Sequence, residues 1–191
     1  SVSAAVVKVG ADLGVIFDAD CDRAAIVDKT GREINRNRLI ALISAILLSE
    51  KQGLTIVTDS VTSSGLAKFI GEWGGVHYRY KRGYRNVIDE AIRLNAEGIE
   101  CPLAIETSGH AAMKENYFLD DGAYLVTKLL IELARGKKEG YTLASLIDTL
   151  YMMKVPQRGK TTYNVGTISG GTSVNTIAQH AEMLYEFRSD D

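Results

Sequence analysis

Apolar residues follow two different spacings along the chain, and these spacings predict alternating strands and helices. Short continuous apolar runs indicate buried strands, and the alternation at residues 76–80 indicates a strand with one wetter face. Apolar residues that recur every three or four positions indicate helices with one buried face. We expect strands at residues 13–17, 24–27, 54–58, 76–80 and 103–105, and helices at residues 38–49, 63–73, 87–94, 123–135 and 143–150. This alternation predicts an α/β fold with a mostly parallel mixed sheet, helices on both faces, and ligands at the carboxyl ends of the strands.

Three aspartates alternate with small residues directly after the first apolar run, where residues 18–23 read D-A-D-C-D-R. Three carboxylates in one short loop repel one another unless a cation lies between them, and Mg²⁺ prefers oxygen ligands of this kind. The sequence therefore predicts a magnesium site at Asp18, Asp20 and Asp22. Arg23, next to it, can hold a phosphate through two parallel hydrogen bonds. The alternative is an acidic turn that contacts only solvent.

A second polar turn, residues 106–110, follows the apolar residues 103–105 and reads E-T-S-G-H. Glu106, Ser108 and His110 place a carboxylate, a hydroxyl and an imidazole on one turn, and such groups can form hydrogen bonds with neighbouring sugar hydroxyls. Gly109 allows a close approach of the backbone. The alternative is purely structural, with Ser108 capping the turn and His110 packed against its neighbours.

Composition narrows the class of protein further. Of the 191 residues, 46% are hydrophobic and 24% are charged, and the net charge of −2 gives no basic field for nucleic acid or an anionic membrane. The two cysteines, Cys21 and Cys101, form no C-x-x-C pattern, so neither a disulfide framework nor a zinc site is expected. With no stretch of eighteen apolar residues and no signal-peptide pattern, we expect a cytoplasmic protein that does not bind membranes.

Taken together, the two polar turns resemble motifs of the α-D-phosphohexomutase family, the phosphoglucomutases and phosphomannomutases. That family has a D-G-D-x-D-R-type metal loop followed, about a domain later, by an E-x-S-G-H sugar loop. The resemblance covers residues 4–155 and includes K-R-G-Y at residues 81–84, similar to a K-x-G loop, and D-D-G at residues 120–122. The pairing and order of the two loops are more specific than either motif alone.

The resemblance implies an isomerase that transfers a phosphoryl group between O1 and O6 of a hexose through a phosphoserine and a bisphosphorylated intermediate. It implies Mg²⁺ as cofactor at the three loop aspartates and a hexose phosphate as substrate. Arg23 would act in catalysis beside the substrate or the phosphoserine. Lys81, Glu106, Ser108 and His110 would bind the substrate.

The chain departs from the family pattern at single positions and as a whole. Ala19 and Cys21 replace glycines of the metal loop, Val61 stands where many bacterial members have lysine, and Tyr84 stands where some have histidine. The family's T-A-S-H-N-P phosphoserine loop and serine-rich phosphate clamp are not found in this sequence. We therefore expect a fragment that is incomplete relative to the family and inactive alone, and edges left by missing domains would favour self-association.

The resemblance also predicts how the chain divides. Residues 1–33 resemble the end of the family's second domain, residues 34–155 resemble its third domain, and residues 156–191 read as a linker and an unrelated tail. Within the tail, residues 161–191 are similar to a lid-domain segment of zinc aminopeptidases and aminoacylases, through G-x-I-x-G-G-T-x-x-N ending at Asn175. The zinc ligands of those enzymes are not present, so we expect a β-hairpin-like segment without chemistry of its own.

Two other functions remain open. A strand followed by D-x-D also resembles haloacid-dehalogenase-like phosphatases, in which Asp18 would be the nucleophile. Thr58, Lys114 and the pair 120–121 would then supply the later motifs, although Asp22 fits that family poorly. The second alternative is a non-catalytic module that binds sugar phosphates or mediates association.

Overall fold

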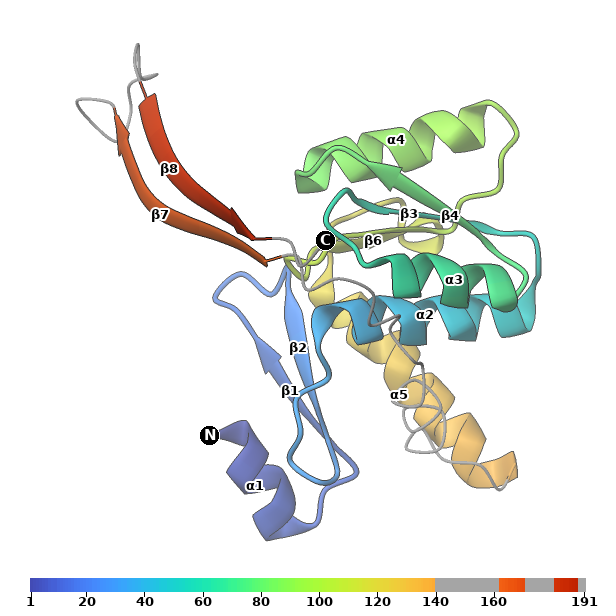
Figure 1. The fold of residues 1–191 in the computed structure, drawn as a ribbon. Coiled ribbons are helices and arrows are strands. Elements are labelled where there is room, and N and C mark those ends of the chain that lie inside the picture. The colour runs from blue at the N-terminus through green and yellow to red at the C-terminus, as the bar shows by residue number, and fades with distance from the viewer. Residues whose placement is uncertain (140–161, 171–180, 189–191) are drawn as a thin grey trace. The chain divides into compact units, whose positions relative to one another are not determined.

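The computed structural model describes residues 1–139, 162–170 and 181–188 and divides into two compact units, residues 1–153 and 154–191 (Figure 1). The predicted helix at 143–150 and Asn175 lie outside the described residues. In chain order the elements are α1 (Val2–Val9), β1 (Leu13–Phe17), β2 (Ala24–Asp28), α2 (Arg36–Glu50), β3 (Thr55–Asp59), α3 (Ser64–Glu72), β4 (Val76–Tyr80), α4 (Tyr84–Ala96), β5 (Leu103–Ile105), β6 (Ala111–Met113), the 3₁₀ helix η1 (Lys114–Asn116), α5 (Gly122–Glu139), β7 (Thr162–Gly170) and β8 (Ala181–Arg188).

The central sheet of the first unit has four strands in the order β4-β3-β5-β6. Strand β3 runs parallel to both β4 and β5, so that Ile56 pairs with His77 on one side and with Leu103 on the other. Strand β6 returns antiparallel to β5, with Ala104 opposite Ala112. The predicted mostly parallel mixed sheet is therefore confirmed.

Helices cover both faces of this sheet, as expected (Figure 1). On one face, α2, α3 and α5 pack with the sheet into the larger apolar core, in which Leu42 and Ile56 are fully buried. On the other face, α4 packs through Val87, Ala91 and Leu94 against Val57 and its neighbours. In the described part of the chain, no helix has the length and apolar character needed to cross a membrane.

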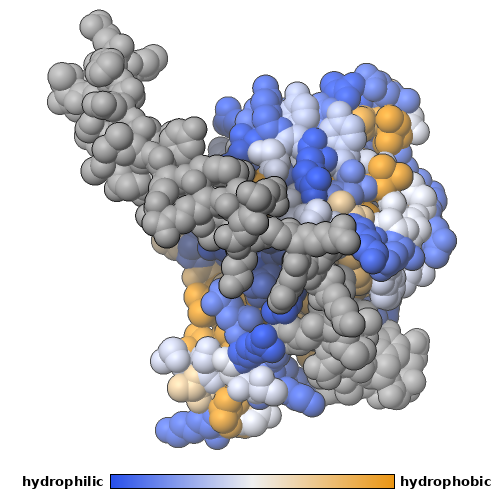
Figure 2. Space-filling model, in the orientation of Figure 1, coloured by the Kyte–Doolittle hydropathy of each residue, from blue (hydrophilic) through white to orange (hydrophobic). Residues whose placement is uncertain are grey.

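Strands β1 and β2 form a separate antiparallel hairpin against which α1 packs. The fit is close at Gly14, where an added Cβ would lie 2.5 Å from the Val6 side chain. The opposite face of the hairpin packs on the larger core through Val15 and Ile26. Towards the end of β1 the cover is thinner: Ile16 is 45% exposed and Phe17 39%, and Figure 2 shows apolar surface beside the hairpin. The turn between the strands, residues 18–23, is the acidic loop.

The sequence did not predict three elements, α1, β6 and η1, and it placed the start of α4 three residues late, at Val87 instead of Tyr84. Strand β6 has only three residues, Ala-Ala-Met, and is too short for a visible alternation. Helix α1 has a Ser1 cap and ends at Gly10 in a left-handed conformation, both ordinary boundary signals.

The second unit contains one described feature, the antiparallel pair β7–β8, which has an irregularity in register between Val165 and Thr167. The predicted hairpin-like character of the tail is therefore confirmed for residues 162–170 and 181–188. Its resemblance to peptidase lids, and the division of the chain at residues 33 and 155, remain predictions.

Candidate functional site

The carboxyl ends of the three parallel strands lie at one edge of the sheet, and each strand ends in or is followed by a charged residue. Asp59 ends β3, Lys81 follows β4, and Glu106 follows β5. The turn of the β1–β2 hairpin comes to the same place, because Arg23 forms an isolated antiparallel bridge with His110. The two loops that the sequence singled out therefore lie side by side.

The three aspartates of the hairpin turn lie close together. Asp18, Asp20 and Asp22 each offer a carboxylate oxygen, and these oxygens lie within 4.8 Å of one another. Asp18 and Asp22 are partly buried and Asp20 is exposed. The turn is held in shape by Cys21, whose φ of 62° lies in the left-handed region that glycine usually occupies, and whose amide donates to the Asp18 carbonyl at 3.3 Å.

Arg23 neutralises part of this negative charge. Its Nε lies 2.6 Å from Oδ2 of Asp18 and 3.3 Å from Oδ1 of Asp22, and its backbone amide donates to Asp18 at 3.2 Å. Partial desolvation works to raise the pKa of the Asp18 carboxyl, but the hydrogen bonds from the Arg23 backbone and side chain outweigh it, so that the pKa is lowered. The predicted catalytic arginine thus pairs with two of the predicted metal ligands.

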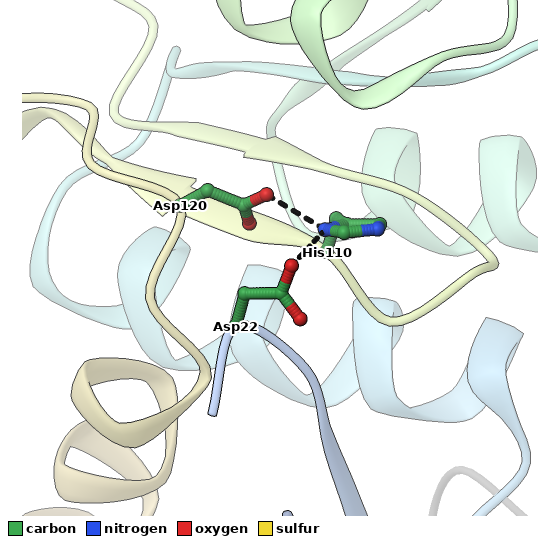
Figure 3. A group of neighbouring side chains, drawn as sticks. All are labelled: Asp22, His110 and Asp120. Carbon is green, nitrogen blue, oxygen red and sulfur yellow. Dashed lines mark hydrogen bonds and ion pairs between the residues drawn. The ribbon is translucent and has the colours of Figure 1, made fainter. Parts of the chain in front are cut away.

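His110 stands between two carboxylates that come from different parts of the chain (Figure 3). Its Nδ1 lies 2.6 Å from Oδ2 of Asp120 and 3.5 Å from Oδ2 of Asp22. The pKa of Asp120 is raised, mainly because its carboxyl is partly desolvated, with the nearby Asp22 adding to the effect and His110 opposing it. With Nδ1 engaged by Asp120, Nε2 is the ring nitrogen left to face a ligand.

Glu106 is almost completely buried, at 4% exposure, and both of its oxygens accept hydrogen bonds from the protein. Oε1 accepts from the Gly83 amide at 2.6 Å and Oε2 from the Ser108 hydroxyl at 2.9 Å. Since Ser108 donates its proton to Glu106, its oxygen remains able to accept from a sugar hydroxyl. Glu106 thus orients the turn and joins it to the loop after β4.

A buried aspartate at the end of β3 also holds the turn at residues 106–110, and the sequence patterns did not predict it. Asp59 has 0% exposure, and its Oδ2 accepts hydrogen bonds from the Thr107 hydroxyl at 2.6 Å and from the Thr107 amide at 3.1 Å. Arg36, at the start of α2, donates to the Thr107 carbonyl at 2.8 Å. A carboxylate directly after an apolar strand was the signal that could have found Asp59, as it found Asp18 and Glu106.

Helix α4 contributes an aromatic ring to the site through its first residue. Tyr84 stacks on the imidazole of His110, with ring centroids 4.9 Å apart, and is 41% exposed. Lys81 lies close by in sequence, but its Nζ lies 5.6 Å from the ring centroid of Tyr80. Val61 is 57% exposed and brings no charge to this edge.

These residues fit a magnesium ion. The donor set consists of carboxylate oxygens, which suit a hard cation, and it lies in an accessible loop that leaves room for water or phosphate ligands. Asp22 also belongs to the group with His110 and Asp120, so a cation held by the loop would stand beside the imidazole. Arg23 already donates to one oxygen of Asp18 and one of Asp22, so a cation would share these two carboxylates with the guanidinium.

Fold and site together define an α/β protein whose polar loops gather at the carboxyl end of a parallel sheet, where such proteins bind ligands. The family model described as phosphoglucomutase/phosphomannomutase, alpha/beta/alpha domain III, matches residues 35–152. The chain belongs to this family of phosphohexomutases, and the resemblance inferred from the two loops is confirmed.

Individual relatives agree with this assignment. A phosphomannomutase/phosphoglucomutase of Pseudomonas syringae pv. tomato is 35% identical over 66% of this chain and 26% of its own length. A phosphoglucosamine mutase of Myxococcus xanthus is 31% identical over 75% of this chain and 31% of its own length. A crystal structure of a phosphoglucomutase/phosphomannomutase family protein from Burkholderia thailandensis covers 84% of this chain and 32% of its own, with a TM-score of 0.65 and 30% identity. The chain therefore spans about a quarter to a third of the length of these proteins.

Proposed function

We propose that this chain provides the magnesium-binding and hexose-recognition parts of a phosphohexomutase, which moves a phosphoryl group between O1 and O6 of a hexose phosphate. The observation that carries the proposal is the junction of the two loops, where Asp22 lies 3.5 Å from His110 and Arg23 pairs with His110 along the backbone. A phosphorylated sugar bound at this junction meets charge-neutralising and hydroxyl-recognising groups at the same time.

Each residue has a chemical task in this proposal. Asp18, Asp20 and Asp22 hold Mg²⁺, which when bound neutralises charge on the phosphoryl group. Arg23 contacts the aspartates through Nε and offers its other guanidinium donors to a phosphate oxygen. Ser108 accepts a hydrogen bond from a sugar hydroxyl, and His110 presents Nε2 to the sugar while Asp120 fixes the opposite side of its ring. Glu106 contacts the sugar less than the resemblance implies, because its burial leaves little surface for a ligand.

The chain alone is expected to bind without turnover, because no T-A-S-H-N-P segment that could carry the phosphoryl group occurs in its sequence. A hexose phosphate is thus the expected partner, with neither nucleic acid nor a membrane. Conversion of glucose 1-phosphate or mannose 1-phosphate by the purified chain in a coupled assay would refute this part of the proposal.

The binding part is tested by calorimetry with MgCl₂ and then with glucose 1-phosphate in the presence of MgCl₂. We expect Asp20→Asn to weaken Mg²⁺ binding at least tenfold, whereas Asp89→Asn, an exposed acid on α4, leaves it unchanged. Ser108→Ala should weaken the binding of glucose 1-phosphate without changing the binding of Mg²⁺. Ser49→Ala, at the far end of α2, is its control and should change neither. Equal Mg²⁺ affinity in Asp20→Asn and Asp89→Asn would contradict the metal site.

The phosphatase alternative has less support in this geometry. Thr58 is buried, with its hydroxyl 3.1 Å from that of Thr62 and 2.7 Å from His77, and Lys114 lines a cleft with Leu54 and Pro102 at the amino end of the strands. A beryllofluoride adduct trapped on Asp18 would favour that alternative. Sugar-phosphate binding that needs no Mg²⁺ would instead favour the non-catalytic binding module.

A further inference from the structure

The acidic loop lies directly on the first residue of α5. Gly122 is buried, and its backbone amide donates to the carbonyl oxygen of Cys21 at 3.1 Å. A Cβ added at Gly122 would lie 2.8 Å from the carbonyl carbon of Arg23, 3.0 Å from its nitrogen and 3.0 Å from the Cys21 oxygen. Real Cβ atoms essentially never approach a neighbour within 3.0 Å, so any side chain at residue 122 requires a displacement.

The atoms that Gly122 meets are backbone atoms, which cannot turn aside as the end of a long side chain can. They belong to the residues on either side of Asp22, whose carboxylate is shared by the group with Asp18 and Asp20 and by the group with His110 and Asp120. Cys21 already holds a left-handed φ of 62°, so the loop has few alternative conformations to move into. A side chain at residue 122 would therefore displace the backbone beside Asp22, whose carboxylate belongs to both groups.

From these contacts we propose that Gly122 is a positioning residue for the metal loop, and that the first turn of α5 sets where the Asp22 carboxylate stands relative to Asp18 and Asp20. The inference rests on the proposed function in one respect, that these aspartates bind Mg²⁺. It assigns a task to the glycine of the D-D-G segment at residues 120–122, whose first aspartate already holds His110.

The contact between Gly122 and the acidic loop joins two parts of the chain that are about a hundred residues apart. If the contact affects Mg²⁺ binding, then Mg²⁺ binding must also affect the contact. Because coupling between two equilibria is reciprocal, a contact that raises Mg²⁺ affinity is itself strengthened when Mg²⁺ binds. The Gly122 amide, hydrogen-bonded to the loop, reports this directly. Its hydrogen exchange should slow by at least threefold on addition of saturating MgCl₂ to the wild-type chain.

The main experiment compares Gly122→Ala with Gly71→Ala. Both exchange glycine for alanine in a helix, but a Cβ at Gly71, in α3, meets no atom within 4 Å. Calorimetry with MgCl₂ should show at least tenfold weaker binding in Gly122→Ala and less than a twofold change in Gly71→Ala. Amide NMR shifts in residues 18–23 should change in the first variant alone. Wild-type Mg²⁺ affinity in Gly122→Ala, with unchanged shifts in the loop, would overturn the proposal.

Failure of the metal site itself gives a different result. If neither wild type nor Gly71→Ala binds Mg²⁺, the proposed function fails, while displaced loop shifts in Gly122→Ala still support the positioning of Asp22 by α5. If Gly122→Ala does not fold, the exchange measurement on the wild-type chain decides. A Gly122 amide whose exchange rate is the same with and without bound Mg²⁺ would then sink the inference.

Discussion

Nδ1 of His110 lies 2.6 Å from Oδ2 of Asp120, and the amide of the next residue, Ala111, donates to Oδ1 of the same carboxylate. An ionised carboxylate can only accept, so Nδ1 of the imidazole is the donor at this contact. Asp120 thus fixes both the tautomer of His110 and the direction of its ring. Stacking with Tyr84 at 4.9 Å holds the ring from one face.

Replacing Asp120 by alanine removes the acceptor that selects this tautomer. We expect the imidazole of His110 in Asp120→Ala to become a mixture of Nδ1-H and Nε2-H forms, whereas the wild type is predominantly Nδ1-H. Long-range ¹H–¹⁵N correlation spectra at pH 8 measure this directly. The signals of His77 serve as an internal control, because its ring forms a hydrogen bond with Thr58 of β3 and does not contact Asp120. A single unchanged tautomer at His110 would show that Asp120 does not select it.

Arg23 pairs with two carboxylates that a metal ion would also use, and its charge is available to a phosphate, so its removal should act in opposite directions on two ligands. In Arg23→Gln we expect Mg²⁺ affinity to rise about two- to fivefold, because an exposed ion pair is lost. Glucose 1-phosphate affinity should fall. Lys68→Gln on α3 removes the same charge from an exposed pair with Glu72 and should change neither. Weaker Mg²⁺ binding in Arg23→Gln would rule out this competition.

The buried hydrogen bond between Thr107 and Asp59 should be visible in stability. Thr107→Val keeps the shape of the side chain but leaves the fully buried Asp59 carboxylate with one donor fewer, at a cost of about 1–3 kcal/mol in the free energy of unfolding. Thr127→Val removes a hydroxyl that donates to a carbonyl on an exposed helix face. It should change the free energy of unfolding by less than about 0.5 kcal/mol. Urea denaturation measures both, and similar losses would show that Asp59 does not depend on Thr107.

Local patterns in the sequence predicted the strands and the carboxylates at their ends, but not the contacts between distant loops. Apolar runs predicted β1 and β5, and an alternation of apolar and polar residues predicted β4, each at its observed bounds. Of the three, β5 is buried throughout, as a continuous apolar run indicates. Asp18 and Glu106 were found as carboxylates at strand ends. Their meeting through Arg23 and His110 could be expected only from the family resemblance, because residues 23 and 110 share no local pattern.

What the sequence could not supply is the direction in which each side chain points. Glu106 reads as a ligand for sugar hydroxyls, yet it is buried and bonded to Gly83 and Ser108. Lys81 reads as a substrate contact, yet its Nζ lies over Tyr80. Gly122 reads as the start of a helix, and its closeness to Arg23 depends on how α5 packs against the hairpin. Long-range packing decides the surroundings of Glu106 and Gly122, and one sequence carries no record of it.

His77 should make the stability of the fold depend on pH. Its Nδ1 is buried without a partner in the described part of the chain, and burial, with Arg79 nearby, lowers its pKa from 6.5 to about 4. Between pH 6.5 and about 4, His77 binds a proton in the unfolded chain but stays neutral in the folded chain. Stability is therefore complete above pH 6.5 and falls as the pH drops towards 4, by at most about 3 kcal/mol. His77→Gln keeps a partner for Thr58 but cannot titrate, so urea denaturation between pH 4.5 and 7.5 should give a shallower loss. Parallel curves for both proteins would show that His77 titrates alike in the folded and unfolded states.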